Sequence, residues 1–465
     1  MKFTKSARQR RLFIAGSFAG KINERKREFW LNSVEAKTYF DTLHICNASV
    51  SKKIHADGFE EEYFPTWLSH SKVDSSRLVW GVLSLFLLLF TSPRFLCEVL
   101  VLEFKTMSFV INWHPMNAFK ILWKFLRLIS GLGQVFRSFS RFALCDGDTV
   151  VVWSEHLTGM RLLKREVRRA GGRLVFSEYG ELPGTTFICD RGMFHESWPL
   201  RYQKQFDALP ISQDEVGEMQ ECIQNIVNER ISSKVGQYAT TATLKALKLP
   251  KGRPVIYVNG VQSHASGLFP RSSEFSKEYS PDFDSNDAML RYFAKLAEKH
   301  DWTILYKDHP NTCNYFSGHE VRDSGWGEHV KILGNIDIYE ILALSDLTVS
   351  LGSKTVYLSL LNKVPVFLMG PYSINSDDLS GGVYSGGDSE EAIISAVQSA
   401  RRLGVDGDGL AEYLTRMMKY YYYSMDDDAD SLFGRGRQQF WKDFLDYMSG
   451  GRSVISARVN ITKSI

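Results

Sequence analysis

The stretches Asp301-Trp-Thr-Ile-Leu-Tyr-Lys-Asp-His-Pro310 and Asp346-Leu-Thr-Val-Ser-Leu-Gly-Ser-Lys-Thr355 decide the fold of this chain. In the first, the apolar run 303–306 predicts a buried strand. Lys307, His309 and a proline that stops any helix follow directly. The first stretch therefore places two side chains that can carry positive charge just beyond the carboxyl end of a strand.

The second stretch repeats this design. The β-branched run 347–350 predicts a strand, and Gly352 permits a sharp turn. Ser353 and Thr355 then stand at the start of an apolar helix over 356–361. The first amides of a helix lack partners and its dipole is positive there, so this helix start is a candidate anion site.

Residues 363–370 predict a further strand and another glycine turn, so three strand ends converge. Open α/β sheets bind ligands at such carboxyl edges. Two plainer interpretations remain, because a His-Pro pair commonly marks a loop and Ser-Leu-Gly-Ser-Lys can simply cap a helix. The order and spacing of strand, Lys-x-His-Pro, helix, strand and Gly-Ser-x-Thr favour a binding site.

These motifs resemble the nucleotide-binding half of GT-B glycosyltransferases that use cytidine-nucleotide donors, especially the β-Kdo-transferase type of capsular polysaccharide biosynthesis. The CDP-glycerol glycerophosphotransferases, which share the His-Pro and Ser-rich elements, are similar too. The resemblance covers about residues 148–372. It implies a CMP-linked or related nucleotide donor and no other cofactor. The donor-binding residues that it implies are Gln262, Lys307, His309, Gly352, Ser353 and Thr355.

Two further residues are candidates for catalysis. Glu178 follows a predicted strand at 173–176, beside Gly180, where a carboxylate can act as a general base or bind an acceptor hydroxyl. Its alternative is a helix-capping or solvated loop acid. Glu178 also matches the acid that the resembled family carries at this strand end, although Tyr179 replaces the usual second acid.

His264 occupies the position that aligns with the acidic nucleophile of the retaining β-Kdo transferases. An imidazole is a poor glycosyl nucleophile, so this departure argues against a double-displacement mechanism. We expect His264 instead to act as a base or to bind the carboxylate or phosphate of the donor.

Composition limits the other possibilities. A chain of 465 residues with 44% apolar residues can form two domains with substantial cores. A net charge of +3 gives no general nucleic-acid signature, so we expect no nucleic-acid partner. The six cysteines lie far apart without metal-ligand spacing, which predicts a reducing cytoplasm and no metal site. The acidic run 426–430 is expected as an exposed turn.

Residues 77–144 are expected as a helical insertion. The uncharged run 78–93 would form a helix of about 24 Å, shorter than the roughly 30 Å hydrocarbon core, which favours a buried or interfacial helix over a span. Lys120, Lys124 and Arg127 fall on one stripe of an otherwise apolar helix, a pattern typical of an anionic membrane interface. A core helix with a solvated basic edge fits equally well.

The sequence thus predicts an α/β protein, GT-B-like, with two Rossmann-like domains at 1–248 and 249–465 and the active site in the cleft. The linker at 249–254 marks the boundary. The expected activity is transfer of a Kdo-like or other sugar onto a surface polysaccharide or glycolipid at the cytoplasmic face of the membrane. Alternatives are a CDP-alcohol glycerophosphotransferase and an inactive membrane-associated scaffold. Residues 380–387 are expected as a mobile loop and 410–423 as one helix.

Overall fold

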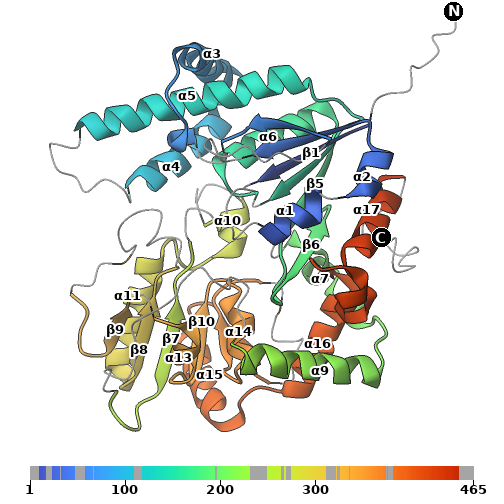
Figure 1. Cartoon of the computed structure of the whole chain (residues 1–465). Coiled ribbons are helices and arrows are strands. Elements are labelled where there is room, and N and C mark those ends of the chain that lie inside the picture. Colours follow the sequence, from blue (N-terminus) through green and yellow to red (C-terminus); the bar gives the residue numbers. More distant parts are fainter. Residues whose placement is uncertain are drawn as a thin grey trace, which may run out of the picture. The chain divides into compact units, whose positions relative to one another are not determined.

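The structure, a computed structural model, divides into two compact units (Figure 1). The N-terminal unit comprises Met1–Gly180, Gly184–Met193 and Tyr420–Ile465, and the C-terminal unit comprises Glu181–Pro183 and Phe194–Lys419. The structure describes residues 10–16, 24–31, 33–47, 58–65, 68–108, 118–153, 155–193, 196–230, 249–262, 266–268, 274–309, 321, 325–334, 336–372, 374 and 381–449.

The N-terminal unit is built on a seven-stranded sheet in the order β13-β6-β5-β4-β1-β2-β3. Strands β1 to β5 are parallel to one another. At one edge β6 runs antiparallel to β5, and β13 pairs in turn antiparallel with β6. From β1 the chain adds β2 and β3 on one side, and from β4 it adds β5 on the other side. The strand order therefore reverses between β1 and β4, as in doubly wound nucleotide-binding folds. The strands are β1 (Arg11–Gly16), β2 (Thr42–Asn47), β3 (Phe59–Tyr63), β4 (Thr149–Trp153), β5 (Arg173–Tyr179), β6 (Thr185–Cys189) and β13 (Tyr422–Ser424).

The C-terminal unit carries a six-stranded, wholly parallel sheet in the order β12-β11-β10-β7-β8-β9. Numbered from its first strand this order is 6-5-4-1-2-3, the Rossmann arrangement, and the direction reverses between β7 and β10. The strands are β7 (Val255–Asn259), β8 (Thr303–Lys307), β9 (Val330–Leu333), β10 (Leu347–Ser350), β11 (Val366–Leu368) and β12 (Val383–Ser385). The predicted α/β fold with two Rossmann-like domains is confirmed.

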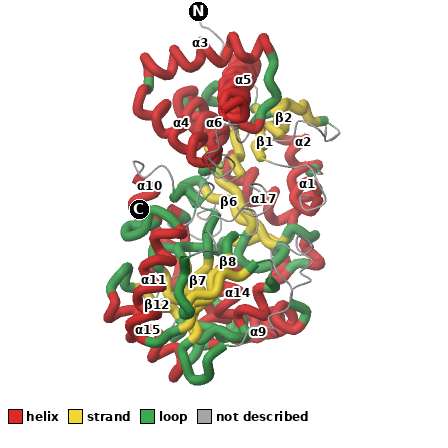
Figure 2. Tube along the Cα trace, turned by 90° about the vertical axis from the view of Figure 1, so that its left-hand side faces the viewer, coloured by secondary structure: helices red, strands yellow, loops and turns green. Residues whose placement is uncertain are grey.

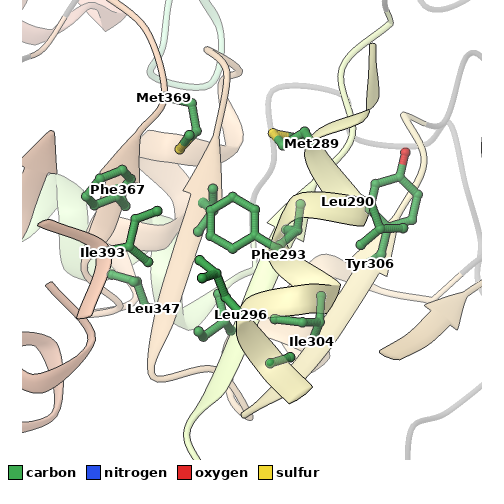
Figure 3. Close-up of a cluster of buried hydrophobic side chains, with 14 of the residues drawn as sticks. Met289, Leu290, Phe293, Leu296, Ile304, Tyr306, Leu347, Phe367, Met369 and Ile393 are labelled. Carbon is green, nitrogen blue, oxygen red and sulfur yellow. The ribbon is translucent and has the colours of Figure 1, made fainter. Parts of the chain in front are cut away.

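Helices cover both faces of the C-terminal sheet. On one face, α11 (Asn286–His300) and α15 (Glu390–Leu403) pack against the strands. Figure 3 shows this core, in which Leu290 and Phe293 of α11 approach Ile304 of β8, and Ile393 of α15 lies beside Phe367 of β11. On the other face lie α13 (Ile338–Leu342) and α14 (Thr355–Leu361). The sheet is therefore buried on both sides and exposes only its strand ends.

The last helix, α17 (Arg437–Met448), belongs to the N-terminal unit. Its Phe440 and Trp441 rings pack edge-on against Trp30 of α1 (Glu24–Leu31), with centroids 5.0 and 5.6 Å away. The helices α2 (Val34–Tyr39) and α6 (Thr158–Ala170) complete the layers beside this sheet. The chain thus returns to its first unit at the end.

Five further helices belong to the C-terminal unit in the described part of the chain. The grouping of α9 with this unit differs from the expected change of domain at 248/249, and residues 231–248 lie outside the described part of the chain. Lys419, at the end of α16, pairs with Glu215 of α9 at 2.6 Å. These helices are α7 (Trp198–Arg201), α8 (Gln203–Asp207), α9 (Gln213–Asn228), α10 (Glu274–Tyr279) and α16 (Gly407–Tyr420).

Two local expectations are wrong. The helix expected over 410–423 ends at Tyr420, because Tyr422–Ser424 pairs with β6 as the antiparallel edge strand β13. The loop expected at 380–387 contains β12, which pairs with β11 in parallel register. In both cases a strand of three residues is too short to produce a recognisable sequence period.

The expected insertion forms three helices between β3 and β4: α3 (Ser75–Thr91), α4 (Pro93–Ser108) and α5 (Ala118–Phe142). Figures 1 and 2 show α3 crossing over α5 and packed against it. A Cβ on Gly81 would lie 2.0 Å from the Ile129 carbonyl oxygen, and one on Gly133 only 1.9 Å from that of Arg77. The two helices therefore touch backbone to backbone. Within the described residues, no helix is both long and apolar enough to cross a membrane.

This contact predicts opposite effects of the same substitution at two helical glycines. Gly133→Ala should destabilise the protein by about 1–3 kcal/mol, since the added methyl group meets backbone. Gly217→Ala in α9 should stabilise it by about 0.5–1 kcal/mol, because that Cβ would meet nothing within 4 Å and alanine favours the helix. Urea unfolding of both variants checks this, and equal midpoints would contradict the close packing of α3 on α5.

Candidate functional site

The ends of β7, β8 and β10 bring the predicted donor residues to one edge of the C-terminal sheet. Asn259, the last residue of β7, stands in register with Ser350 of β10 on one side and with Lys307 of β8 on the other. The Asn259 amide nitrogen donates to the Ser350 hydroxyl at 3.5 Å. The direction of winding reverses between β7 and β10, so this is the place where doubly wound sheets bind ligands.

The loop after β10 is held by a glycine that no other residue could replace without movement. Gly352 has φ of 117°, and a Cβ there would lie 3.0 Å from the rings of Tyr279 and Tyr372. The Tyr279 hydroxyl donates to the Gly352 carbonyl at 2.8 Å. Both tyrosines are fully buried, so they hold this loop against the sheet edge.

The loop after β7 packs equally closely against the end of β8. The Gly260 amide donates to the Lys307 carbonyl at 3.0 Å, and a Cβ on Gly260 would lie 2.7 Å from the Tyr306 hydroxyl oxygen. Asn286 at the start of α11 accepts from the Val261 amide and donates to the Val261 carbonyl. The first residues of both loops are thus positioned by backbone contacts.

Lys307 and His309 lie where the sequence predicted, at the end of β8. The Lys307 ammonium donates to the Ile336 carbonyl, so this lysine also anchors the segment that leads into α13. Asp308 between them is buried and accepts from the Tyr306 hydroxyl at 2.6 Å. Lys307 and His309 themselves are half-buried. Asp308 is therefore fixed inward, and the residues on either side reach the surface of the edge.

Ser353 and Thr355 are half-buried at the start of α14. The Ser353 hydroxyl accepts from the Thr355 amide at 3.3 Å and donates to the Thr355 hydroxyl at 3.2 Å. Helix α14 has only seven residues, so its dipole adds little and the hydroxyl groups carry the site. Gln262 is half-buried just beyond β7, whereas His264 lies outside the described residues.

Glu178 lies within β5 and not in the loop after it, a difference from the expectation. Its backbone pairs with Phe187 of the antiparallel strand β6, which extends β5 to Tyr179. The side chain is half-buried, and its Oε1 accepts from the Tyr179 amide at 3.0 Å. Glu178 therefore has a more rigid backbone than a loop acid, close to the carboxyl end of its strand.

Sequence reasoning missed Lys26, a lysine of α1 that is 1% exposed. Its ammonium lies 4.2 Å from the centre of the Trp153 ring, at the end of β4. Burial lowers the pKa of Lys26 to about 7, although the carboxylate of Glu178 acts in the opposite direction. A buried lysine with a neighbouring carboxylate is a typical feature of functional sites. Residues 17–76 offered no periodic pattern that could have revealed it.

A second buried charged group follows β4. The Glu155 carboxylate is 2% exposed and pairs with the ammonium of Lys164 on α6. His156 is also buried, and its carbonyl accepts from the Arg161 side chain at 3.0 Å. This loop follows β4, where the strand order of the N-terminal sheet reverses. The pair Glu155-His156 directly after a valine-rich strand was the available signal.

The acidic run at 426–430 has a structural role. Asp428 accepts from the amides of Gln438 and Gln439 near the start of α17, and Asp427 pairs with Arg437 at 2.6 Å. In the described part of the chain, no three or more His, Cys, Asp or Glu side chains are grouped so as to hold a metal ion.

No protein-family model and no curated protein matches the chain. Among solved structures it resembles the β-Kdo 2,7-transferase of Thermosulfurimonas dismutans KpsC at 14% identity and a TM-score of 0.38, over 68% of this chain and 89% of that one. The β-Kdo 2,4-transferase of the same protein is 14% identical with a TM-score of 0.41, and the match covers 60% of this chain and 82% of that one. The glycosyltransferase of kitacinnamycin is 10% identical with a TM-score of 0.36, and the match covers 95% of this chain and 99% of that one. Solved β-Kdo transferases, the type that the sequence motifs resemble, are therefore among the structures similar to this chain, at low identity.

The buried lysine predicts a specific dependence of stability on pH. An unfolded lysine has a pKa near 10.4, so between pH 7 and 10.4 the unfolded chain binds more protons and stability rises with pH. Below about pH 7 the cost of burying the charge applies in full. Relative to Lys26→Met, the parent should gain up to about 1.4 kcal/mol per pH unit in this window.

The measurement is urea unfolding of both proteins at several pH values from neutral to alkaline. Lys37→Met, which removes an exposed lysine of α2, is the control and should follow the parent. Parallel curves for the parent and Lys26→Met would show that Lys26 remains charged in the folded protein.

Proposed function

We propose that this chain is a glycosyltransferase that moves a sugar from a nucleotide-activated, CMP-linked donor onto a surface polysaccharide or glycolipid acceptor. The observation that carries the proposal is the carboxyl edge of the C-terminal sheet. There Lys307, His309, Ser353 and Thr355 accompany two glycine loops at the point where the winding reverses. Such an edge combines backbone access with positive charge and hydroxyl donors, as a diphosphate or monophosphate ester requires.

In this proposal the C-terminal unit stabilises the leaving nucleotide. Departure of a nucleotide phosphate develops negative charge, and fixed donors and cations at that position lower the barrier. Lys307 is held at the edge by its bond to the Ile336 carbonyl, so its charge is pre-positioned. His309, beside it, supplies a second donor when protonated. Ser353 and Thr355 offer hydroxyl groups, and Gln262 offers an amide beyond β7.

The N-terminal unit would bind the acceptor and activate its hydroxyl group. Glu178 is the proposed base, and the ammonium of Lys26 is the charged group that acts on it. With a pKa of about 7, Lys26 can take up the proton that Glu178 removes from the acceptor hydroxyl and later pass it to solvent. His264 remains a proposed donor contact. The acceptor would be met at the cytoplasmic face of the membrane.

Two other functions would use the same edge or the same fold. A glycerophosphotransferase would take a CDP-alcohol, and a scaffold would bind no donor. Purified protein should be tested for hydrolysis of CMP-Kdo, CMP-sialate, CDP-glycerol and UDP-sugars. Release of CMP from a CMP-sugar supports the proposal, whereas turnover of CDP-glycerol alone assigns the glycerophosphotransferase. Binding and turnover of none of these donors would overturn a transferase function.

His309→Ala should abolish binding of cytidine nucleotides with little change in stability, because the ring is half-buried at the sheet edge. The matched control is His329→Ala. His329 precedes β9 at the opposite, amino-terminal edge, where its ring contacts the Trp302 carbonyl at 2.8 Å. Calorimetric titration with CMP measures both. Equal affinity of His309→Ala and the parent would remove this histidine from the site.

Glu178→Gln should reduce transfer by roughly 100- to 10,000-fold, as expected for loss of a general base, and leave CMP affinity nearly intact. Glu60→Gln, on the edge strand β3, changes an exposed carboxylate and should retain full activity. Turnover and nucleotide affinity are measured on the same preparations. Parental turnover in Glu178→Gln would make this residue a structural acid.

A further inference from the structure

We propose that α3 is a lipid-binding helix, which lies in the plane of an anionic membrane with its exposed half among the acyl chains. This goes beyond the proposed transfer reaction and depends on a different part of the chain. Its residues belong to the N-terminal unit, whereas the proposed donor site lies in the C-terminal unit.

Helix α3 buries only a narrow stripe of Gly81, Ser84 and Leu88. Successive residues turn by 100°, so the exposed apolar side chains spread over an arc of about 180°. Half of the helix circumference is therefore apolar and uncovered. These side chains are Val79 (62% exposed), Trp80 (43%), Val82 (41%), Leu83 (58%), Phe86 (52%), Leu87 (52%), Leu89 (49%) and Phe90 (81%).

The polar groups on α3 are already satisfied. The Ser84 hydroxyl donates to the Trp80 carbonyl at 2.6 Å, and the Thr91 hydroxyl donates to the Leu87 carbonyl at 2.7 Å. The Asp74 carboxylate caps the helix by accepting from the Arg77 amide. A helix whose hydroxyl groups bond to its own backbone can enter a medium without water at little polar cost.

The charges around the helix select an anionic surface. Residues 75–142 contain eight Lys and Arg residues but only two acidic residues, both Glu. The rest of the chain contains 48 Lys and Arg and 51 Asp and Glu. Of the two acids, Glu103 is fully buried and accepts from the amides of Leu68 and Ser69, and Glu98 pairs with Arg94 at 3.8 Å. The net charge of this segment is thus +6 in a chain of +3. Cations beside an apolar helix favour anionic lipids.

The basic stripe expected on α5 contributes less to the proposed lipid contact than α3 does. Lys124 and Arg127 are half-buried, whereas Trp123 (44% exposed) and Phe125 (36%) are open to solvent. The side chain of Lys120 lies outside the described residues. Burial lowers the pKa of Lys124, and Arg127 adds to this effect. The exposed apolar area of α3 is therefore the main contact, with α5 as its rigid support through Gly81 and Gly133.

A lipid surface fits this geometry better than a folded partner. A helix packed on a protein core typically has an apolar stripe a little over 100° wide, whereas the exposed apolar side chains of α3 cover about 180° in addition to the stripe that packs on α5. Covering the remaining half-circumference requires a medium that closes around the helix from several directions. Acyl chains do so, while headgroups meet the exposed guanidinium of Arg94 just beyond the helix end.

The test is co-sedimentation with vesicles of phosphatidylcholine alone or in equal parts with phosphatidylglycerol. Parent protein should bind the anionic vesicles more tightly. The variant Leu83→Gln/Phe86→Gln/Phe90→Gln should lose roughly 100-fold in partitioning, since three large apolar side chains no longer leave water. The control Val34→Gln/Leu344→Gln/Leu403→Gln changes exposed apolar residues outside the insertion and should bind like the parent.

A second readout guards against a folding defect in the triple variant. Lipids brominated on their acyl chains should quench the tryptophan fluorescence of the parent, and Trp80→Phe should remove much of that quenching. Equal binding by the triple variant and parent, or no binding by the parent, would overturn the proposal. So would a parent dimer in sedimentation that the triple variant dissociates, because a second copy would then cover α3.

Discussion

The contact between Gly352 and Tyr279 is the constraint on which the C-terminal site depends. The ring lies where any side chain at position 352 would be, and its hydroxyl group binds the carbonyl of the same residue. This fixes the path of the chain just after β10 and therefore the direction in which Ser353 and Thr355 leave the sheet. At the neighbouring strand, the Gly260 amide bonds to the Lys307 carbonyl. The site is thus held by backbone before any ligand binds.

The N-terminal unit follows a different physical logic. There two ammonium groups lie over aromatic rings, the buried Lys26 over Trp153 and the half-buried Lys164 over Phe176. A cation on an aromatic face keeps part of its stabilisation when water is removed. Burial lowers the pKa of Lys26 to about 7, so a charge on Lys26 at the end of β4 costs stability. In the proposed reaction, the C-terminal unit would bind the charge of the donor and the N-terminal unit would transfer the proton of the acceptor.

The sequence allowed the central strands and the glycine turns to be predicted because burial on both faces leaves continuous apolar runs, as at 303–306 and 347–350. It also located Lys307, His309, Ser353 and Thr355 at one edge, since strand order converts positions along the chain into positions in space. It did not reveal β3, whose acidic residues at 60–62 resemble a loop, or the burial of Lys26, which depends on strands far away in sequence. Tertiary pairing also extended β5 through Glu178.

The return of α17 to the first unit has a consequence for synthesis of the protein on the ribosome. The Trp30 ring packs against Phe440, Trp441 and Phe444, and the Phe29 ring packs against Phe440. These partners on α17 are translated more than 400 residues later. The C-terminal unit, whose core comes from one nearly continuous segment, can close first. The N-terminal core stays incomplete until α17 has been translated. During that interval the apolar side chains that α17 later covers are exposed on the nascent chain, where they can associate with the wrong partners.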